Sequence, residues 1–385
     1  MKVGVVGCGT MGSGIAQVAA TAGHHVLVYD KNSEQAYKAG EKLKSIMDRL
    51  VEKGKKTQEE ADAIVSRVKF IDNLASFDEC GLVIEAIVEN IDIKHIIFKE
   101  LEDVVPEDCI LATNTSSLSV ASIGSVLEHP ERMVGLHFFN PAPLMPLVEV
   151  VPAVQTKAGL ADECKKLMES WGKAPAIVKD TPGFIVNRVA RPFYGEALRI
   201  YEEGWADFAT IDWAMTELGG FKMGPFTLMD YIGNDVNYVV TETVFASFYY
   251  DQRYKPSFTQ KRHSEAGYLG RKSCRGYYDY SEGAVQPQPN KDEVLGKKIM
   301  DRILCMLINE AVDAVFWNIA SIEDVDLAMT KGVNYPKGLL KWADEIGLEK
   351  VLANLEDLQD KFGEDRYRPS YLMKQMVKEG KTFYN

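Results

Sequence analysis

The sequence predicts an α/β domain with a mostly parallel sheet, followed by two tandem all-helical domains. Three observations support this fold class. Within residues 1–180, short β-rich segments alternate with helical patterns, which is typical of βαβ units. Beyond residue 181 the strand pattern fades and long amphipathic helical patterns replace it. Finally, part of this helical half occurs twice, with an offset of 114 residues between the copies.

Five segments of the first domain have the composition of strands: Val3–Val6, His25–Asp30, Leu82–Ile87, Ile110–Asn114 and Met133–Phe139. A helical excursion from 33 to 68 interrupts their alternation with helices. Its first part carries apolar residues at helical spacing, and Thr57 with Glu60 has the spacing of a capping box that starts a second helix. The expected order is therefore strand, helix, strand, helical hairpin and further βα units.

The internal repeat divides the helical half. Glu196-Ala197 recurs as Glu310-Ala311, and residues 211–216 recur as 325–330. We therefore expect an α/β domain at 1–181, a first helical domain at 182–280, a Gly- and Pro-containing linker at 281–292 and a second helical domain at 293–385. The second copy is expected to dock on the first as an internal pseudo-dimer, which is compatible with a monomer or with a homodimer.

Bulk composition narrows the function classes. The net charge of −12 argues against general nucleic-acid binding. No apolar run approaches the roughly 20 residues of a membrane span, and no signal peptide is evident, so a cytoplasmic location is expected. The six cysteines are scattered without a CxxC pair, so no metal site is predicted.

Residues 7–12 read G-x-G-x-x-G between a strand and an apolar helix, the context of a Rossmann-type dinucleotide site. Gly7 permits the tight turn, Gly9 leaves room for a pyrophosphate, and Gly12 lets the helix approach the strand. Asp30 ends the next strand, where its carboxylate can bind ribose hydroxyls and repel a 2′-phosphate, so NAD is favoured over NADP. Backbone contacts are also expected from Thr10 and Met11. An ordinary Gly-rich turn is the alternative.

A second pattern carries the chemistry. His137 lies at the end of one predicted strand, and Glu149 lies within the apolar run 147–151 that follows. A carboxylate in such a strand is costly unless it is paired, and His137 is the nearest partner. The pair can orient the imidazole so that its free nitrogen removes a hydroxyl proton while hydride leaves the same carbon. From these residues alone, a purely structural His–Glu pair is equally compatible.

Several motifs resemble the L-3-hydroxyacyl-CoA dehydrogenases, and most closely the short-chain 3-hydroxybutyryl-CoA type. The resemblance covers about residues 1–280 and rests on motifs that occur in the family's order, at 86–90, 114–118, 135–141, 147–150, 182–188 and 269–272. It implies NAD-dependent oxidation of a 3-hydroxyacyl-CoA in β-oxidation or butyrate metabolism. The departure from the short-chain type is the duplicated helical domain. At the position of Asn187 the second copy has Asp301, so a non-catalytic copy is expected.

By position, the resemblance assigns roles to individual residues. His137 would be the general base and Glu149 its partner, while Ser116 and Asn187 would hold the substrate oxygens, with Asn140 from the same motif as a further substrate contact. Residues implied near the nicotinamide and its ribose are Ile87, Glu89, Lys94 and Asn114. Without the family, Ser116 is as readily a helix N-cap, and Glu89, Lys94 and Asn114 as readily belong to a solvated face or a turn.

The helical excursion is the candidate site for coenzyme A. The segment from residue 38 to residue 56 contains seven basic and three acidic residues, a local excess of positive charge in an acidic protein. The phosphates of coenzyme A need such charges. By family position Lys53 is the best single candidate, with Arg49 and Lys56 beside it. The alternative is a merely solvated charged face.

Three other functions compete with this interpretation. An L-gulonate-type dehydrogenase would use the same histidine and NAD but would not need the basic excursion. A non-catalytic NAD-binding protein would not need His137, Glu149, Ser116 and Asn187 together. A dual hydratase–dehydrogenase would need a further domain, for which the 385 residues leave no length.

Overall fold

The computed structural model describes residues 1–384, and the chain divides into two compact units, Met1–Phe184 and Ile185–Asn385. The first unit is an eight-stranded sheet with helices, and the second is all-helical. The predicted fold class is thereby confirmed. No helix among the described residues is both long enough and apolar enough to span a bilayer.

The sheet of the first unit has the order β3-β2-β1-β4-β5-β6-β7-β8, and all of its pairings are parallel except β6 with β7. The order reverses between β1 and β4, which is the position where open α/β sheets bind ligands at the strands' carboxyl ends. The strands are β1 Lys2–Val6, β2 His25–Tyr29, β3 Val68–Ile71, β4 Leu82–Glu85, β5 Ile110–Thr113, β6 Met133–Phe138, β7 Leu147–Pro152 and β8 Ala174–Ile177.

Two of these strands were not recognised in the sequence. β3 is short and only partly buried, and β8 contains Pro175, a residue that cannot donate to a strand ladder. Both lie at the two edges of the sheet, where pairing with one neighbour is sufficient. Their short, atypical sequences are therefore tolerated because of where they lie in the sheet.

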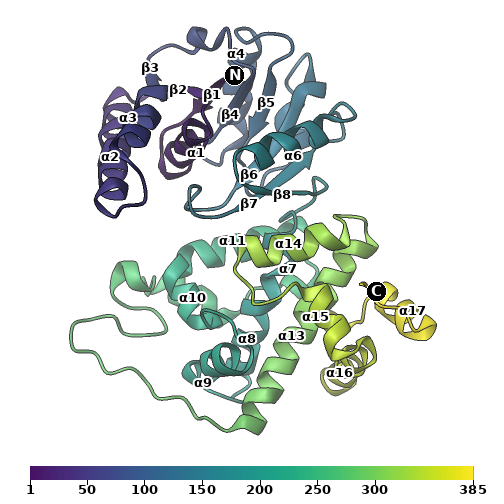
Figure 1. Ribbon diagram of the computed structural model, residues 1–385. Coiled ribbons are helices and arrows are strands. Elements are labelled where there is room, and N and C mark those ends of the chain that lie inside the picture. The colour runs from purple at the N-terminus through teal and green to yellow at the C-terminus, as the bar shows by residue number, and fades with distance from the viewer. Residues whose placement is uncertain (385) are drawn as a thin grey trace. The chain divides into compact units, whose positions relative to one another are not determined.

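The helices of the first unit follow the expected pattern. They are α1 Thr10–Thr21, α2 Ser33–Glu52, α3 Gln58–Arg67, α4 Ile91–Glu102, α5 Val120–Gly124 and α6 Leu160–Ser170. The predicted capping box is confirmed, because Thr57 Oγ1 accepts from Glu60 N at 3.1 Å and Glu60 Oε2 accepts from Thr57 N at 2.9 Å. Figure 1 shows α2 and α3 as a helical hairpin beside β3, at one edge of the sheet.

The second unit contains the two copies of the helical repeat. The first copy comprises α7 Val186–Val189, α8 Arg191–Glu202, α9 Phe208–Trp213 with a π-helical turn at Ala214–Leu218, α10 Pro225–Ile232, α11 Asn234–Ser247 and α12 Phe258–Glu265. The second comprises α13 Glu293–Phe316, α14 Ile322–Gly332, α15 Leu339–Ile346, α16 Leu348–Phe362 and α17 Tyr371–Glu379. Residues 281–292 form neither helix nor strand.

The two copies contact each other through reciprocal ion pairs. Arg188 Nε donates to Glu310 Oε1 at 2.8 Å, and its repeat equivalent Arg302 donates through Nε to Glu196 Oε2 at 3.0 Å. Each pair thus joins the arginine of one copy to the glutamate of the other. Such an exchange of equivalent residues is the pattern of a two-fold interface, here within one chain. Three of these four buried side chains come from α8 and α13, which pack against each other, and Arg188 comes from α7.

Candidate active site

The glycine-rich turn lies between β1 and α1. Gly7 has φ +96°, and a Cβ atom there would lie 2.6 Å from the Ala86 carbonyl oxygen, so a side chain is excluded. A Cβ on Gly12 would lie 1.9 Å from the Gly7 oxygen, which shows how closely α1 approaches the turn. At Gly9, by contrast, a Cβ would meet no atom within 4 Å. Each of the three glycines therefore has the surroundings that a dinucleotide turn requires.

Asp30 follows β2 and is held by the same turn. Its Oδ2 accepts from the Cys8 amide at 2.9 Å, and its Oδ1 accepts from the Asn32 amide at 2.9 Å. A carboxylate has about four acceptor positions, so further hydrogen bonds from two vicinal hydroxyls remain possible. Asp30 is half-buried and directly follows the carboxyl end of β2.

The residues of the turn fit NAD. Gly9 is the N-cap of α1 but has no side chain to cap it, and the first turn of α1 contains no acidic residue. The free amides and the positive end of this helix therefore suit a pyrophosphate, for which Gly9 leaves space. Thr10 and Met11 begin the helix at this point, and Asp30 would carry the ribose specificity.

A buried charge network follows β4, and it includes a residue that sequence reasoning missed. Glu85 is fully buried and accepts hydrogen bonds from Lys94 Nζ at 2.6 Å, from Thr113 Oγ1 at 2.7 Å and from the Ile87 amide at 2.7 Å. Lys94 Nζ also lies 3.2 Å from Glu89 Oε2. A glutamate within the apolar segment Leu82–Glu85 is costly unless paired, and that was the available signal.

Lys94 is therefore not on a solvated face, which corrects that alternative. It is 1% exposed, because α4 directs it between Glu85 and Glu89. Glu89 Oε1 in turn accepts from Thr115 Oγ1 at 2.6 Å and from the amides of Ser116 at 3.0 Å and Ser117 at 3.1 Å. The network thus ties the loop after β4 to the loop after β5.

Electrostatics keep Glu89 ionised. Desolvation acts to raise the pKa of its carboxyl, but attraction to Lys94 and hydrogen bonds from Thr115, Ser116 and Ser117 outweigh it, so the pKa lies below its usual value. A carboxylate whose ionised form is favoured therefore accepts from the Ser116 backbone amide. Helix α5 is instead capped by Ser119, whose hydroxyl accepts from the Ser122 amide at 3.2 Å, so the N-cap alternative for Ser116 is wrong.

The predicted His–Glu pair is present as two cross-strand partners. His137 of β6 lies opposite Glu149 of β7 in the antiparallel register, and His137 Nδ1 is 2.7 Å from Glu149 Oε2. The histidine is 7% exposed and the glutamate 0%. A carboxylate at this distance favours the tautomer that carries its proton on Nδ1, which leaves Nε2 as an acceptor.

Neighbouring groups hold the imidazole and its strand. The rings of Phe139 and Phe184 lie 4.5 Å and 5.7 Å from the His137 ring, centroid to centroid. Asn114, at the end of β5, accepts from the Phe138 amide through Oδ1 at 2.8 Å. Asn114 therefore fastens the end of β6 to β5 beside His137, while the exposed Asn140 lies in the loop that follows.

The remaining predicted site residues belong to other elements of the chain. Asn187 is half-buried on α7, in the second unit. Arg49 and Lys53 are exposed on and after the last turn of α2, and Lys56 is half-buried just before α3. None of the ion pairs between described residues involves these three basic side chains, which is compatible both with phosphate binding and with a solvated face.

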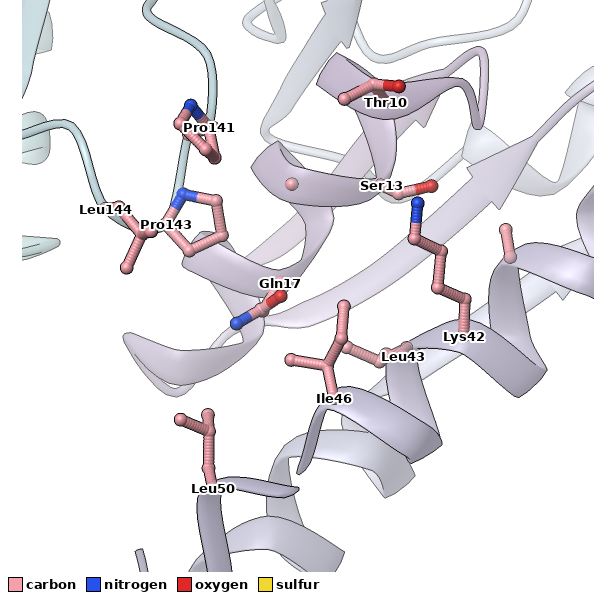
Figure 2. A pocket seen from close by; sticks show the side chains of 13 residues that line it. Thr10, Ser13, Gln17, Lys42, Leu43, Ile46, Leu50, Pro141, Pro143 and Leu144 are labelled. Carbon is pink, nitrogen blue, oxygen red and sulfur yellow. The ribbon is translucent and has the colours of Figure 1, made fainter. Parts of the chain in front are cut away.

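A pocket of about 290 Å³ lies between α1, α2 and the loop after β6. Figure 2 shows Lys42 of α2 pointing toward Ser13 of α1, while Leu43, Ile46 and Leu50 line the same side and Pro141, Pro143 and Leu144 the other. The lining is mainly apolar, and Leu50 of α2 precedes Lys53, the residue that follows this helix, by three positions. Sequence analysis did not identify this pocket, because it depends on how the excursion packs against α1.

Comparisons with known proteins agree with this geometry. The family model described as 3-hydroxyacyl-CoA dehydrogenase, NAD binding domain, matches residues 2–181, and the model described as 3-hydroxyacyl-CoA dehydrogenase, C-terminal domain, matches twice, at 183–280 and 299–383. The chain belongs to the 3-hydroxyacyl-CoA dehydrogenase family. The resemblance found in the sequence and the assignment of NAD as cofactor are thereby confirmed.

Individual relatives of this family match most or nearly all of the chain. A 3-hydroxyadipyl-CoA dehydrogenase of Escherichia coli K12 is 36% identical, over 97% of this chain and 96% of its own. A probable 3-hydroxybutyryl-CoA dehydrogenase of Bacillus subtilis is 41% identical over 73% of this chain and 98% of its own. A solved structure described as 3-hydroxybutyryl-CoA dehydrogenase from E. coli K12 has a TM-score of 0.93 at 35% identity, over 98% of each chain.

Proposed function

We propose that this protein oxidises the secondary alcohol of a short-chain L-3-hydroxyacyl-CoA to the 3-keto thioester, reversibly, with NAD⁺. The observation that carries the proposal is the buried His137–Glu149 pair at 2.7 Å, at the carboxyl end of β6. That edge of the sheet also holds the glycine turn and Asp30, so a proton acceptor and a dinucleotide site occur in one unit. NAD⁺, when bound, supplies the hydride acceptor.

In this mechanism the chain's residues position the alcohol and move its proton. His137 Nε2 accepts the hydroxyl proton while Glu149 stabilises the imidazolium that forms. Ser116 and Asn187 hydrogen-bond the substrate oxygens, and the charged Glu89 fixes the Ser116 backbone. Lys94 and Glu89 would lie near the nicotinamide ribose, where their mutual pairing at 3.2 Å limits their movement.

Coenzyme A would lie along the helical excursion. The apolar pocket between α1 and α2 suits the pantetheine arm, and Lys53, with Arg49 and Lys56, would bind the phosphates. This assignment distinguishes the proposal from a dehydrogenase of a free hydroxy acid, which has no use for a basic helix. We also propose a cytoplasmic location. The protein is either a monomer, since the reciprocal ion pairs between its repeats already supply a two-fold interface, or a homodimer built on another surface.

Consumption of NADH with acetoacetyl-CoA, compared with free acetoacetate, tests the function. We expect turnover of the thioester alone, and a roughly 10²–10⁴-fold loss of kcat in His137→Gln with NADH binding retained. Turnover of both compounds at similar kcat/KM would contradict the CoA thioester as substrate. A His137→Gln variant with more than half of the wild-type kcat would refute the role of His137.

A further inference from the structure

Two carboxylates and one ammonium group lie together at the carboxyl end of β4, within the first unit. Glu85 Oε1 accepts from Lys94 Nζ at 2.6 Å, and Lys94 Nζ also lies 3.2 Å from Glu89 Oε2. Glu85 and Lys94 are buried, so salt and water screen their charges little. The Glu85–Lys94–Glu89 cluster therefore carries one net negative charge.

Glu85 gives the cluster one more negative charge than the neutralisation of Lys94 requires. Glu89 alone already lies within ion-pair distance of Lys94. The other partners of Glu85 are neutral, because the Ile87 amide and the Thr113 hydroxyl each donate to it at 2.7 Å. Burying a charge that no opposite charge balances costs free energy. A cationic ligand beside the cluster would offset this cost, whereas a neutral ligand would not.

The order of the strands places the cluster between the two ends of a bound dinucleotide. Asp30, the proposed contact of the adenosine ribose, follows β2, and His137 lies on β6, while β1, β4 and β5 lie between them in the sheet. Hydride leaves the carbon whose hydroxyl proton His137 accepts, so the nicotinamide ring has to reach toward β6 from the turn after β1. It therefore crosses the carboxyl ends of β4 and β5, where the cluster lies.

The cluster can act on a ligand at this edge of the sheet. A Cβ atom on Gly7 would lie 2.6 Å from the oxygen of Ala86, so the residue that follows Glu85 borders the dinucleotide turn. Glu89 is the exposed member of the cluster, whereas Glu85 and Lys94 are buried. A ligand that continues from the turn can therefore approach Glu89, and the buried charge of Glu85 adds to the electrostatic attraction.

We propose that Glu85 makes the protein discriminate between the two oxidation states of its cofactor, in favour of NAD⁺. The nicotinamide ring of NAD⁺ carries a positive charge that it loses on accepting hydride, so the net negative charge of the cluster attracts the oxidised ring alone. Glu85 is thus a specificity-determining residue that acts through its charge and not through contact with the cofactor. The inference goes beyond the proposed function, on which it rests through the role of His137.

Calorimetric titration of the protein with NAD⁺ and with NADH, without substrate, measures both dissociation constants directly. For Glu85→Gln we expect the ratio of the Kd of NAD⁺ to the Kd of NADH to rise roughly 4- to 20-fold above the wild-type ratio. This is the range for two unit charges about 10 Å apart at an effective dielectric constant between about 20 and 40. The rise should depend little on salt concentration, because the cluster is buried.

A double variant tests whether the net charge is the cause. Glu85→Gln combined with Lys94→Met removes one negative and one positive charge, so the cluster again carries one net negative charge. The ratio should then return toward the wild-type value, even where the loss of Lys94 weakens the binding of both cofactor forms. Neutral replacement of both members of a buried ion pair is often tolerated, so this variant also serves if Glu85→Gln alone does not fold.

Two single variants control for structural effects. Thr113→Val removes the hydroxyl that donates to Glu85 but keeps both carboxylates, so it should retain the wild-type ratio. Glu100→Gln neutralises an exposed carboxylate on α4, the helix that carries Lys94, and should retain the ratio as well.

Three results would overturn the inference. The first is an unchanged ratio in a folded Glu85→Gln variant, including an equal loss of affinity for both cofactor forms. The second is a rise in Thr113→Val as large as that in Glu85→Gln, and the third is a double variant whose ratio stays away from the wild-type value. A wild type that binds both cofactor forms without consuming NADH in the presence of acetoacetyl-CoA would instead refute the proposed function.

Discussion

Replacing Glu149 by Gln tests the proposed catalytic role of the His137–Glu149 pair by changing one side-chain oxygen to an amide nitrogen. The side chain keeps its shape, but an amide can donate to His137 Nδ1, which would move the ring proton to Nε2 and block proton acceptance there. In the proposed mechanism the carboxylate also stabilises the imidazolium of the transition state, and the amide does not. Both groups are buried and 2.7 Å apart, so the small interaction free energies of solvent-exposed ion pairs do not apply to them.

The magnitude follows from two limits. A hydrogen bond to a charged group contributes about 1.5–3 kcal/mol. Two unit charges 4 Å apart, at an effective dielectric constant of about 20, attract by about 4 kcal/mol. At about 1.4 kcal/mol for each factor of ten, these limits correspond to a roughly 10- to 1,000-fold loss of kcat. Steady-state NADH consumption with saturating acetoacetyl-CoA measures it.

The control is Glu163→Gln, which neutralises an exposed carboxylate on α6 of the same unit and should leave kcat unchanged. NADH binding and the thermal unfolding midpoint of Glu149→Gln establish that the unit is intact. If a folded Glu149→Gln enzyme keeps more than half of the wild-type kcat, the carboxylate does not assist His137 and the reasoning fails.

Three further outcomes are expected. Asp30→Ser should weaken NAD binding and raise the NADP/NAD ratio of kcat/KM, because it removes the carboxylate that repels a 2′-phosphate; wild-type turnover with NADP equal to that with NAD would contradict this. Lys53→Glu should raise KM for acetoacetyl-CoA severalfold but not for a truncated pantetheine thioester, which lacks the distal phosphates of coenzyme A, whereas Lys69→Glu, exposed on β3, should change neither KM; equal effects on both thioesters would argue for a solvated face. Truncation after Ser281 should give aggregation or a concentration-dependent dimer in light scattering, because it removes α13 from its contact with α8; a soluble, active, monomeric product would make the second repeat an appendage.

The local sequence was sufficient for several features. The glycine turn, the capping box at Thr57 and the strand ending at His137 follow from short-range patterns, because they depend on backbone sterics and on the period of apolar residues. The His137–Glu149 pair could be predicted because a charge in an apolar strand demands a partner nearby. The duplication was visible because both copies keep the same residues at one offset.

Long-range packing decided the rest. The edge strands β3 and β8 exist because a neighbouring strand pairs with them, which their own residues do not reveal. Lys94 is buried because α4 directs it against Glu85 of β4. The reciprocal ion pairs of Arg188 and Arg302 join residues more than 100 positions apart, so they form only when the two repeats pack together. The sequence by itself determined the central strands and helices of the first unit, the glycine turn and the His137–Glu149 pair, because their causes are local. The tertiary structure decided which charges are buried and with whom, because a partner distant in sequence determines whether a buried charge is compensated.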